Sequence, residues 1–273
     1  MNNSISVKHS FAAGDLISVL PGLQKQFQET GHKFKIYQWI DFPAHYYDLA
    51  VYSTIDANGV EVCMNKTLFE KLKPLIEKQK YIESFEIWGG EKIDIDLDLT
   101  RLDKSIPMPS GILHQYPVAI FPELQADLSK RWIYLDENSY KLETHVEGKI
   151  IINRTQRYQN PYINYFFLKK YIGQILFTGT DKEYDVFCAQ WGLSKHELPQ
   201  LKTTDFEYLA IAMKRAKGFV GNQSFCWHLA DAMKIPRILE LCAAFPNTFP
   251  NGSDGYAFYK QQALEHYFDK IVR

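Results

Sequence analysis

Along the chain, short apolar runs typical of strands alternate with longer segments in which apolar residues recur at helical spacing. This alternation predicts strands joined by helices. Residues 5–9 form a short apolar run typical of a strand, and residues 16–30 repeat apolar side chains at helical spacing. Residues 33–39 form a second β-favouring run. A strand, a helix and a strand in this order predict a βαβ unit with parallel strands. Pro21 lies inside the helical pattern, where it should kink the helix or delay its start.

The alternation of predicted strands and helices continues to the carboxyl terminus. Further strands are predicted at residues 49–52, 60–64, 81–88, 149–153, 174–178 and 237–241, and helices at 66–79, 161–171 and 204–216, with another that follows residue 181 and ends at 191. Residues 136–148 are polar and weakly periodic, which is typical of an interdomain linker. We therefore expect an α/β protein with two domains, residues 1–145 and 146–273. A last amphipathic helix, predicted at 256–272, could pack on either domain, including back on the N-terminal one.

Composition indicates an ordinary globular protein and excludes some classes of function. The 273 residues are 46% hydrophobic and 23% charged, with a formal net charge of −1. A nearly neutral chain without a long basic run has little with which to neutralise phosphates, so we expect no nucleic-acid partner. The first residues lack the pattern of a signal peptide, and no apolar run is long enough to cross a bilayer. We therefore expect a cytoplasmic protein without a transmembrane segment.

Three aspartates alternate with apolar residues, and two explanations fit them. Asp94, Asp96 and Asp98 form Asp-x-Asp pairs, which bind Mn²⁺ or Mg²⁺ in some enzymes. Alternation in a strand also places all three carboxylates on one face, so a solvated sheet face explains them equally well. The four cysteines lack Cys-x-x-Cys spacing, which argues against a zinc site.

Residues 218–241 carry the strongest local signal, a strand, a tight turn, a helix and a strand. Gly221 permits the turn, and Asn222 or Ser224 can cap the helix. The start of such a helix presents free amides and a positive dipole end, which suits an anion such as a diphosphate. His228 lies four residues after Ser224 and would add a donor from the same face. An ordinary capped connection without a ligand explains the same residues.

Two other loops are expected at the carboxyl ends of strands, where α/β proteins bind their ligands. One contains Arg154 and Arg157, whose guanidinium groups can bind phosphate oxygens in pairs, although solvated surface arginines are an alternative. The other contains Asp15, which is either a general base or the N-cap of the first helix. The chain lacks Gly-x-Gly-x-x-Gly, so an NAD enzyme is not expected. Ser224 lacks the flanking glycines of a hydrolase nucleophile.

Motifs in both halves of the chain occur in an order that one enzyme family shares. Near the amino terminus these are Gly14-Asp15-Leu16 and Leu20-Pro21. In the second half they are Ile175-Leu-Phe-Thr-Gly179, residues 206–216, and Phe219-Val-Gly-Asn-Gln-Ser224 with His228-Leu-Ala230. Together they resemble glycosyltransferase family 9, the heptosyltransferase-like enzymes of lipopolysaccharide synthesis. That family has Gly-Asp-x-Leu…Leu-Pro near its start and usually Gly-x-Asp-Ser/Thr-Gly-x-x-His where it holds the nucleotide diphosphate.

The resemblance implies a GT-B fold, in which two Rossmann-like domains face each other across a cleft. It implies an inverting glycosyltransferase without a catalytic metal or other cofactor, which moves a sugar from a nucleotide-diphosphate donor to a hydroxyl of a glycan or glycolipid. Asp15 would be the general base, in an acceptor-side loop that includes Gly14. The residues that would bind the donor diphosphate are Arg154, Thr155, Arg157, Asn222, Gln223, Ser224 and His228. A glycolipid acceptor would bring the protein to the inner face of the cell membrane as a peripheral protein.

The chain departs from the family pattern at a point that matters for the substrate. The segment Asn222-Gln-Ser-Phe225 stands where the family has Asp-Ser-Gly, which leaves the identity of the donor sugar open. We therefore keep two other functions as alternative hypotheses. A non-catalytic sugar-nucleotide-binding protein would keep Arg154 but would not need Asp15. A nucleotide-sugar epimerase or hydrolase would need a Tyr-x-x-x-Lys pair or a serine nucleophile, and Tyr256 and Lys260 match the first in spacing only.

Overall fold

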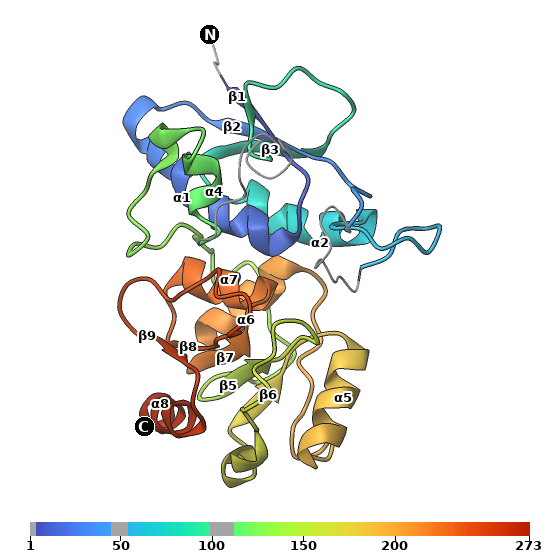
Figure 1. The fold of residues 1–273 in the computed structure, drawn as a ribbon, viewed down its shortest axis with the longest axis vertical. Helices are drawn as coiled ribbons and strands as arrows, with labels where there is room; N and C mark the ends of the chain where they lie inside the picture. The colour runs from blue at the N-terminus through green and yellow to red at the C-terminus, as the bar shows by residue number, and fades with distance from the viewer. Residues whose placement is uncertain (1–3, 45–53, 99–111) are drawn as a thin grey trace. The chain divides into compact units, whose positions relative to one another are not determined.

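The chain folds into two compact α/β units (Figure 1). The computed structural model describes residues 4–44, 54–98 and 112–273. Unit 1 comprises residues 1–128, 132–134 and 205–207, and unit 2 comprises residues 129–131, 135–204 and 208–273. The predicted division at residue 145 therefore falls inside unit 2.

Unit 1 is built on a parallel four-stranded sheet in the order β3–β2–β1–β4. Its strands are β1 (Ile5–His9), β2 (Phe34–Gln38), β3 (Ile82–Ile87) and β4 (Ile95–Asp96), and its longer helices are α1 (Ala13–Thr30) and α2 (Lys66–Glu77). β1 and β2 pair in parallel, with Ile5 opposite Phe34, which confirms the predicted βαβ unit. The side chains without exposed surface include Val7, Leu16, Leu20, Ile36, Leu72 and Phe85. The strand predicted at 49–52 lies outside the described residues, and residues 60–64 form only isolated bridges.

The helix α1 accommodates Pro21 without the predicted delay, because a distant side chain replaces the missing hydrogen bond. Proline has no N–H, so the carbonyl group of Ile17, four residues earlier, loses its helical partner. The indole Nε1 of Trp132 donates to that carbonyl at 2.9 Å. Because Trp132 is almost fully buried, this bond anchors the short segment 132–134 to α1 within unit 1.

A glycine in α1 allows the helix to approach the 3₁₀ turn η1 (Pro122–Leu124) closely. A Cβ atom on Gly22 would lie 2.6 Å from the carbonyl oxygen of Leu124 and 2.8 Å from its Cβ. Helix propensity favours alanine over glycine by about 1 kcal/mol. Overpacking of a tight contact costs about 1–3 kcal/mol, so the close approach explains why glycine occupies this helical position.

The strand β4 is shorter than the predicted strand that contains the three aspartates. The carboxylate of Asp96 accepts a hydrogen bond from the backbone N–H of Asp98 at 3.0 Å, and this local bond competes with strand pairing. Each aspartate has a partner on β1 or directly after it: Asp94 with the N–H of Ser6, Asp96 with the ammonium of Lys8, and Asp98 with the hydroxyl of Ser10. These bonds engage the three carboxylates within the protein, and Asp98 has no exposed surface, so a solvated sheet face does not describe all three. The described part of the chain also contains no group of three side chains placed to hold a metal ion.

Unit 2 is built on a parallel five-stranded sheet in the order β6–β5–β7–β8–β9. The strands are β5 (Ile150–Asn153), β6 (Ile175–Phe177), β7 (Gly218–Asn222), β8 (Arg237–Glu240) and β9 (Gly255–Phe258). The helices are η2 (Phe166–Tyr171, a 3₁₀ helix), α5 (Asp181–Trp191), α7 (Phe225–Met233), α8 (Gln261–Val272) and α6 (Phe206–Arg215), whose first two residues belong to unit 1. Two α/β units with parallel sheets confirm the predicted fold class. None of the helices in residues 4–44, 54–98 and 112–273 combines the length and apolarity needed to cross a membrane.

The helix predicted at 161–171 does not form as expected, and only η2 is present. The side chain of Asn160 accepts a hydrogen bond from the N–H of Tyr162 at 3.0 Å, and the side chain of Asn164 accepts one from the N–H of Phe166 at 3.3 Å. The first bond is one that an N-cap residue would also make, but the second uses the N–H of Phe166, which a helix from residue 161 would bond to the carbonyl group of residue 162.

The carboxyl-terminal helix α8 packs on unit 2, so the prediction that it could pack back on the N-terminal domain is wrong. Leu264 and Phe268 are part of the hydrophobic core of unit 2. The ring of Phe268 meets that of Phe167 edge-on, with 5.2 Å between centroids. Residues 255–258 pair with β8 as strand β9, and the helix therefore begins only at Gln261.

Candidate functional site

The predicted donor-binding residues gather at the carboxyl edge of the unit 2 sheet. Three of the connections at this edge concern the site: residues 154–165 after β5, 223–224 after β7, and 241–254 after β8. In parallel α/β sheets, ligands bind outside the carboxyl ends of the strands. The three connections are tied to one another by the side chains of three consecutive residues, Asn222, Gln223 and Ser224.

Asn222, the last residue of β7, binds the loop that follows β5. Its Oδ1 accepts a hydrogen bond from the N–H of Thr155 at 2.9 Å. Its Nδ2 donates to the carbonyl oxygens of Thr155 and Arg157 at 3.1 and 2.5 Å. The residue has no exposed surface. Both ends of the amide are therefore used within the protein, and they hold Thr155 and Arg157 in place.

Gln223 binds the loop that follows β8. Its Nε2 donates to the carbonyl oxygen of Phe245 at 2.7 Å and to Oδ1 of Asn247 at 2.5 Å. Its Oε1 accepts a hydrogen bond from the N–H of Cys242 at 3.0 Å. This side chain is also buried, so its polar atoms position the loop and are not directed at solvent.

Ser224 caps α7, as predicted. Its Oγ accepts from the N–H of Trp227 at 3.3 Å and donates to Oδ1 of Asn153 at 2.8 Å. Asn153 in turn donates from Nδ2 to the carbonyl oxygen of Thr178 at 2.8 Å. The ends of β5 and β6 are thus bonded to the start of α7. Because the serine hydrogen goes to an amide oxygen, which is not a base, this arrangement does not suit a serine nucleophile.

Gly221 lies within β7 and not in a turn, which corrects the interpretation of this glycine. A Cβ atom there would lie 2.6 Å from the carbonyl oxygen of Asn153 and 2.7 Å from the ring of Phe219. The glycine is therefore required by the close approach of β5 to β7. The reversal of the chain follows after Asn222, where Ser224 begins the helix.

Arg154 forms a buried ion pair with Glu240 at the end of β8. Its Nε and Nη2 bond to Oε2 and Oε1 of Glu240 at 2.9 and 2.8 Å. Arg154 is 3% exposed and Glu240 has no exposed surface. Glu240 also accepts hydrogen bonds from the hydroxyl of Tyr165 at 2.7 Å and from the N–H of Asn160 at 2.6 Å. The bidentate edge of the guanidinium, which we expected to bind phosphate, therefore binds a carboxylate of the protein itself.

The surroundings of Arg154 keep its guanidinium charged. Burial acts to lower the pKa of Arg154, but the hydrogen bonds and charge of Glu240 outweigh it and raise that pKa. Burial also raises the pKa of Tyr165 well above its usual value, so the phenol stays protonated and donates. One guanidinium nitrogen of Arg154, Nη1, is buried without a hydrogen-bond partner among the described residues. A buried charged donor in this state is suited to an anionic ligand.

The remaining predicted residues lie at the same edge. The guanidinium of Arg157 lies 5.8 Å from the ring centroid of Tyr158, and the residue is half-buried. His228 lies one turn into α7 and is 7% exposed. Burial raises the pKa of the neighbouring thiol of Cys226 to about 12, which excludes a thiolate nucleophile there at neutral pH.

The predicted base, Asp15, lies in the first turn of α1 in unit 1 and is half-buried. The N-cap of this helix is Ala12, so Asp15 is not the capping residue that the alternative supposed. The helix dipole favours a carboxylate in the first turn. Gly14, beside it, is buried.

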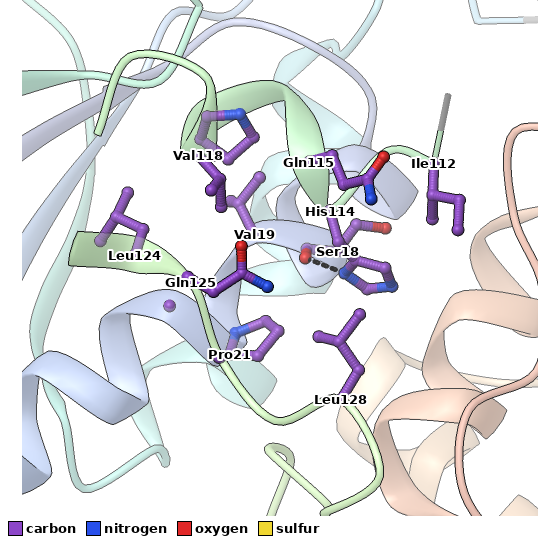
Figure 2. Close-up of a pocket in the computed structure, with 13 residues that line it drawn as sticks. Ser18, Val19, Pro21, Ile112, His114, Gln115, Val118, Leu124, Gln125 and Leu128 are labelled. Atoms are coloured by element: carbon purple, nitrogen blue, oxygen red, sulfur yellow. Dashed lines mark hydrogen bonds between the residues drawn. The ribbon is translucent and has the colours of Figure 1, made fainter. Parts of the chain in front are cut away.

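A small cavity lies along the same face of α1 in unit 1 (Figure 2). Its volume is about 60 Å³. Ser18, Val19 and Gly22 line one wall, and they follow Asp15 at spacings that place them on one helical face. The other walls come from the short helix α4 (Gln115–Val118) and the segment after it, through His114, Gln115, Val118, Leu124 and Gln125. The imidazole of His114 bonds to the carbonyl oxygen of Ser18. A cavity of this size holds a few waters or one small substituent of a ligand.

Comparison with protein-family models and with curated proteins finds no match, whereas comparison with solved structures does. The glycosyltransferase family 9 protein of Veillonella parvula has a TM-score of 0.59 at 12% identity, over 99% of this chain and 90% of that one. The E. coli heptosyltransferase WaaC, solved with ADP-2-deoxy-2-fluoro heptose, has a TM-score of 0.61 at 11% identity, over 98% and 99%. The dodecameric iron-containing heptosyltransferase TibC, solved with ADP-D-β-D-heptose, has a TM-score of 0.57 at 14% identity, over 94% and 63%.

The chain shares its fold with the family 9 glycosyltransferases. This likeness extends over nearly the whole chain, so both units have their counterparts in that fold. It agrees with the resemblance that the motifs around Asp15 and Ser224 suggested. The roles of individual residues stay predictions.

Three residues at this edge of the family 9 fold were not predicted from the sequence: Asn153, Tyr165 and Glu240. Glu240 lies in a strand that the apolar pattern predicted to be buried. A carboxylate in such a strand needs a buried partner, and this is the signal that could have identified it. Asn153 and Tyr165 carry no comparable signal, because their partners lie far away in the sequence.

Proposed function

We propose that the protein transfers a sugar from a nucleotide-diphosphate donor to a hydroxyl group of a glycan or glycolipid, with inversion of the anomeric carbon and without a metal ion. The donor diphosphate would bind at the carboxyl edge of the unit 2 sheet, where α7 begins. One observation supports this proposal most directly. The side chains of Asn222, Gln223 and Ser224 form hydrogen bonds that join the start of α7 to β5 and to the loops after β5 and β8. These bonds fix the amino terminus of α7, whose amide groups and dipole favour an anion.

The three side chains would support the diphosphate site without contacting it, since their polar atoms are used within the protein. The expected ligand contacts are the backbone amides at the start of α7, together with Nη1 of Arg154 and the guanidinium of Arg157. A charge-assisted hydrogen bond from Nη1 would contribute about 1.5–3 kcal/mol to donor binding.

Asp15 would remove the proton from the acceptor hydroxyl as its oxygen attacks the anomeric carbon. Attack from the side opposite the leaving diphosphate inverts the configuration. Negative charge grows on the diphosphate as the bond breaks, and preorganised amides and guanidinium groups would stabilise that charge. A metal ion is then not needed to balance the leaving group. A glycolipid acceptor would place this chemistry at the cytoplasmic face of the membrane.

The structure weakens one alternative and leaves another to be tested. Tyr256 lies in β9, where its ring stacks on Tyr267 at 4.5 Å between centroids, and Lys260 is the N-cap of α8. No helix therefore holds this pair at the spacing an epimerase would need. A non-catalytic sugar-nucleotide-binding protein would keep the same donor site and have no use for Asp15.

A transfer assay on the full chain tests the proposal. We expect a panel of nucleotide-diphosphate sugars to include a donor whose nucleoside diphosphate is released when a glycan acceptor is added, with EDTA present as well as without it. Release without an acceptor would indicate a hydrolase, and binding without release would indicate the non-catalytic alternative. A strict requirement for Mn²⁺ would contradict the metal-independent mechanism and would direct attention to Asp94 and Asp96.

A further inference from the structure

Two tryptophans lie side by side at the carboxyl edge of the unit 1 sheet. Trp39 directly follows β2 and Trp88 directly follows β3, and the strand register places Gln38 opposite Ile87. The ring centroids of the two indoles are 5.2 Å apart and their planes are inclined by 55°. Trp39 is 37% exposed and Trp88 is half-buried, so both indoles reach the surface at this edge.

The ammonium group of a buried lysine, Lys8, contacts both indole rings. The ammonium of Lys8 lies 5.4 Å from the ring centroid of Trp39 and 5.1 Å from that of Trp88. Lys8 is only 6% exposed, so it occupies the protein side of the rings. The attraction between a cation and the faces of two indoles fixes their orientation. The exposed surface of Trp39 therefore points away from Lys8, as part of a rigid aromatic surface.

Beneath this surface, buried and half-buried rings extend toward the start of α1, since Phe11 is only 2% exposed and Phe42 packs on the same core cluster. The ring of Phe42 lies 5.1 Å from that of Trp39 and 5.8 Å from that of Phe11, measured between centroids. Phe11 directly precedes Ala12, the N-cap of α1. A row of aromatic rings thus runs within unit 1 from the paired tryptophans to the start of the helix whose first turn contains Asp15.

The charges beside the tryptophans select among possible ligands. The carboxylate of Asp96 lies 2.9 Å from the ammonium of Lys8, and its side chain is 28% exposed. Because Asp96 balances the charge of Lys8, the pair offers little attraction to a phosphate backbone or an anionic lipid surface. An uncharged pyranose ring suits this surface better than either of these anionic ligands. Its C–H bonds carry partial positive charge toward the negative face of an indole, and its hydroxyls can donate to an exposed carboxylate.

We propose that Trp39 and Trp88 form a stacking platform for a saccharide. The assignment of this saccharide as the sugar of the acceptor rests on the proposed transferase activity. On that basis the acceptor is a glycan or the glycan part of a glycolipid, bound in unit 1 through the C–H face of one sugar ring.

Saturation-transfer NMR on the full chain tests the platform. The probes are the methyl glycosides of glucose, galactose, mannose and N-acetylglucosamine. We expect at least one to receive magnetisation through its ring protons, and we expect Trp39→Ala and Trp88→Ala to weaken its affinity by about tenfold. Trp39→Phe should keep most of the affinity, because it retains an aromatic face. The matched control is Tyr162→Ala, which removes an 85% exposed aromatic side chain from unit 2 and should leave glycoside binding unchanged.

Other results would overturn the platform. These are the absence of any signal from the four glycosides with the wild-type chain, or equal signals with wild type and both alanine variants. A concentration-dependent dimer that Trp39→Ala abolishes would show that the surface binds a second copy of the chain. Thermal unfolding of the same variants with and without nucleoside diphosphates tests the transferase activity separately from the saccharide platform. Saccharide binding without a nucleotide effect would remove the transferase, and a nucleotide effect without saccharide binding would remove only the platform.

Discussion

Replacing Asp15 with asparagine is expected to lower kcat for sugar transfer by about 10²–10⁴-fold, the usual contribution of a positioned general base. Asparagine keeps the size and polarity of the side chain but cannot take the proton from the acceptor hydroxyl. The affinity for the donor should stay at the wild-type value, since the predicted donor site lies in unit 2. Steady-state release of nucleoside diphosphate gives kcat, and calorimetric titration gives the dissociation constant of the donor.

The matched control for this variant is Glu29→Gln, which removes a carboxylate charge from the other end of α1. The side chain of Glu29 is 53% exposed and forms only a surface ion pair with Lys25, so both kcat and stability should be nearly unchanged. Wild-type turnover in the Asp15→Asn variant would exclude Asp15 as the base. A parallel loss of donor binding would indicate a structural role for the side chain.

Replacing Arg154 with methionine is expected to lower the free energy of unfolding by about 3–5 kcal/mol, because it leaves the buried carboxylate of Glu240 without its cation. Glu240 would keep its bonds to Tyr165 and Asn160, but these are not charged partners. Urea denaturation of the full chain measures the change. A loss of stability of this size would show that Arg154 stabilises the carboxyl edge of the unit 2 sheet.

Two further variants make the Arg154 experiment specific. Arg157→Met, on the same loop, should change the free energy of unfolding by less than about 0.5 kcal/mol, because Arg157 is only half-buried. Combining Arg154→Met with Glu240→Gln should restore part of the loss, since glutamine is neutral and still accepts hydrogen bonds. Wild-type stability in Arg154→Met together with lost donor binding would mean that the arginine serves the ligand and not the fold.

The features that the sequence predicted correctly depend on local chemistry. Ser224 caps α7 because its hydroxyl reaches an amide three residues later, and such spacing is visible in a sequence. The βαβ unit at the amino terminus follows from apolar periodicity alone. The fold class and the carboxyl-edge position of Arg154 and Asn222 follow from the same periodicity, because strand ends locate loops.

The features that were missed or misplaced depend on contacts between distant residues. The bidentate edge of Arg154 was expected to face a phosphate, but it binds Glu240, 86 residues later. The carbonyl of Ile17, freed by Pro21, is satisfied by Trp132, 115 residues later. Neither partner can be read from local spacing. The polar side chain of Asn222 looked like a ligand contact for the same reason, since a sequence does not show that its amide is already bonded within the protein.

The proposed transferase activity depends on one claim, that the edge of unit 2 at the start of α7 binds a nucleoside diphosphate. Thermal unfolding of the full chain with ADP, UDP, GDP and CDP tests it most directly. A ligand present at one hundred times its dissociation constant stabilises a protein by about 2.7 kcal/mol, which corresponds to a rise in Tm of roughly 5–10 °C for a chain of this size. We predict such a rise with at least one of the four and none with the matching nucleoside. An unchanged Tm with all four diphosphates at millimolar concentration would contradict the claim.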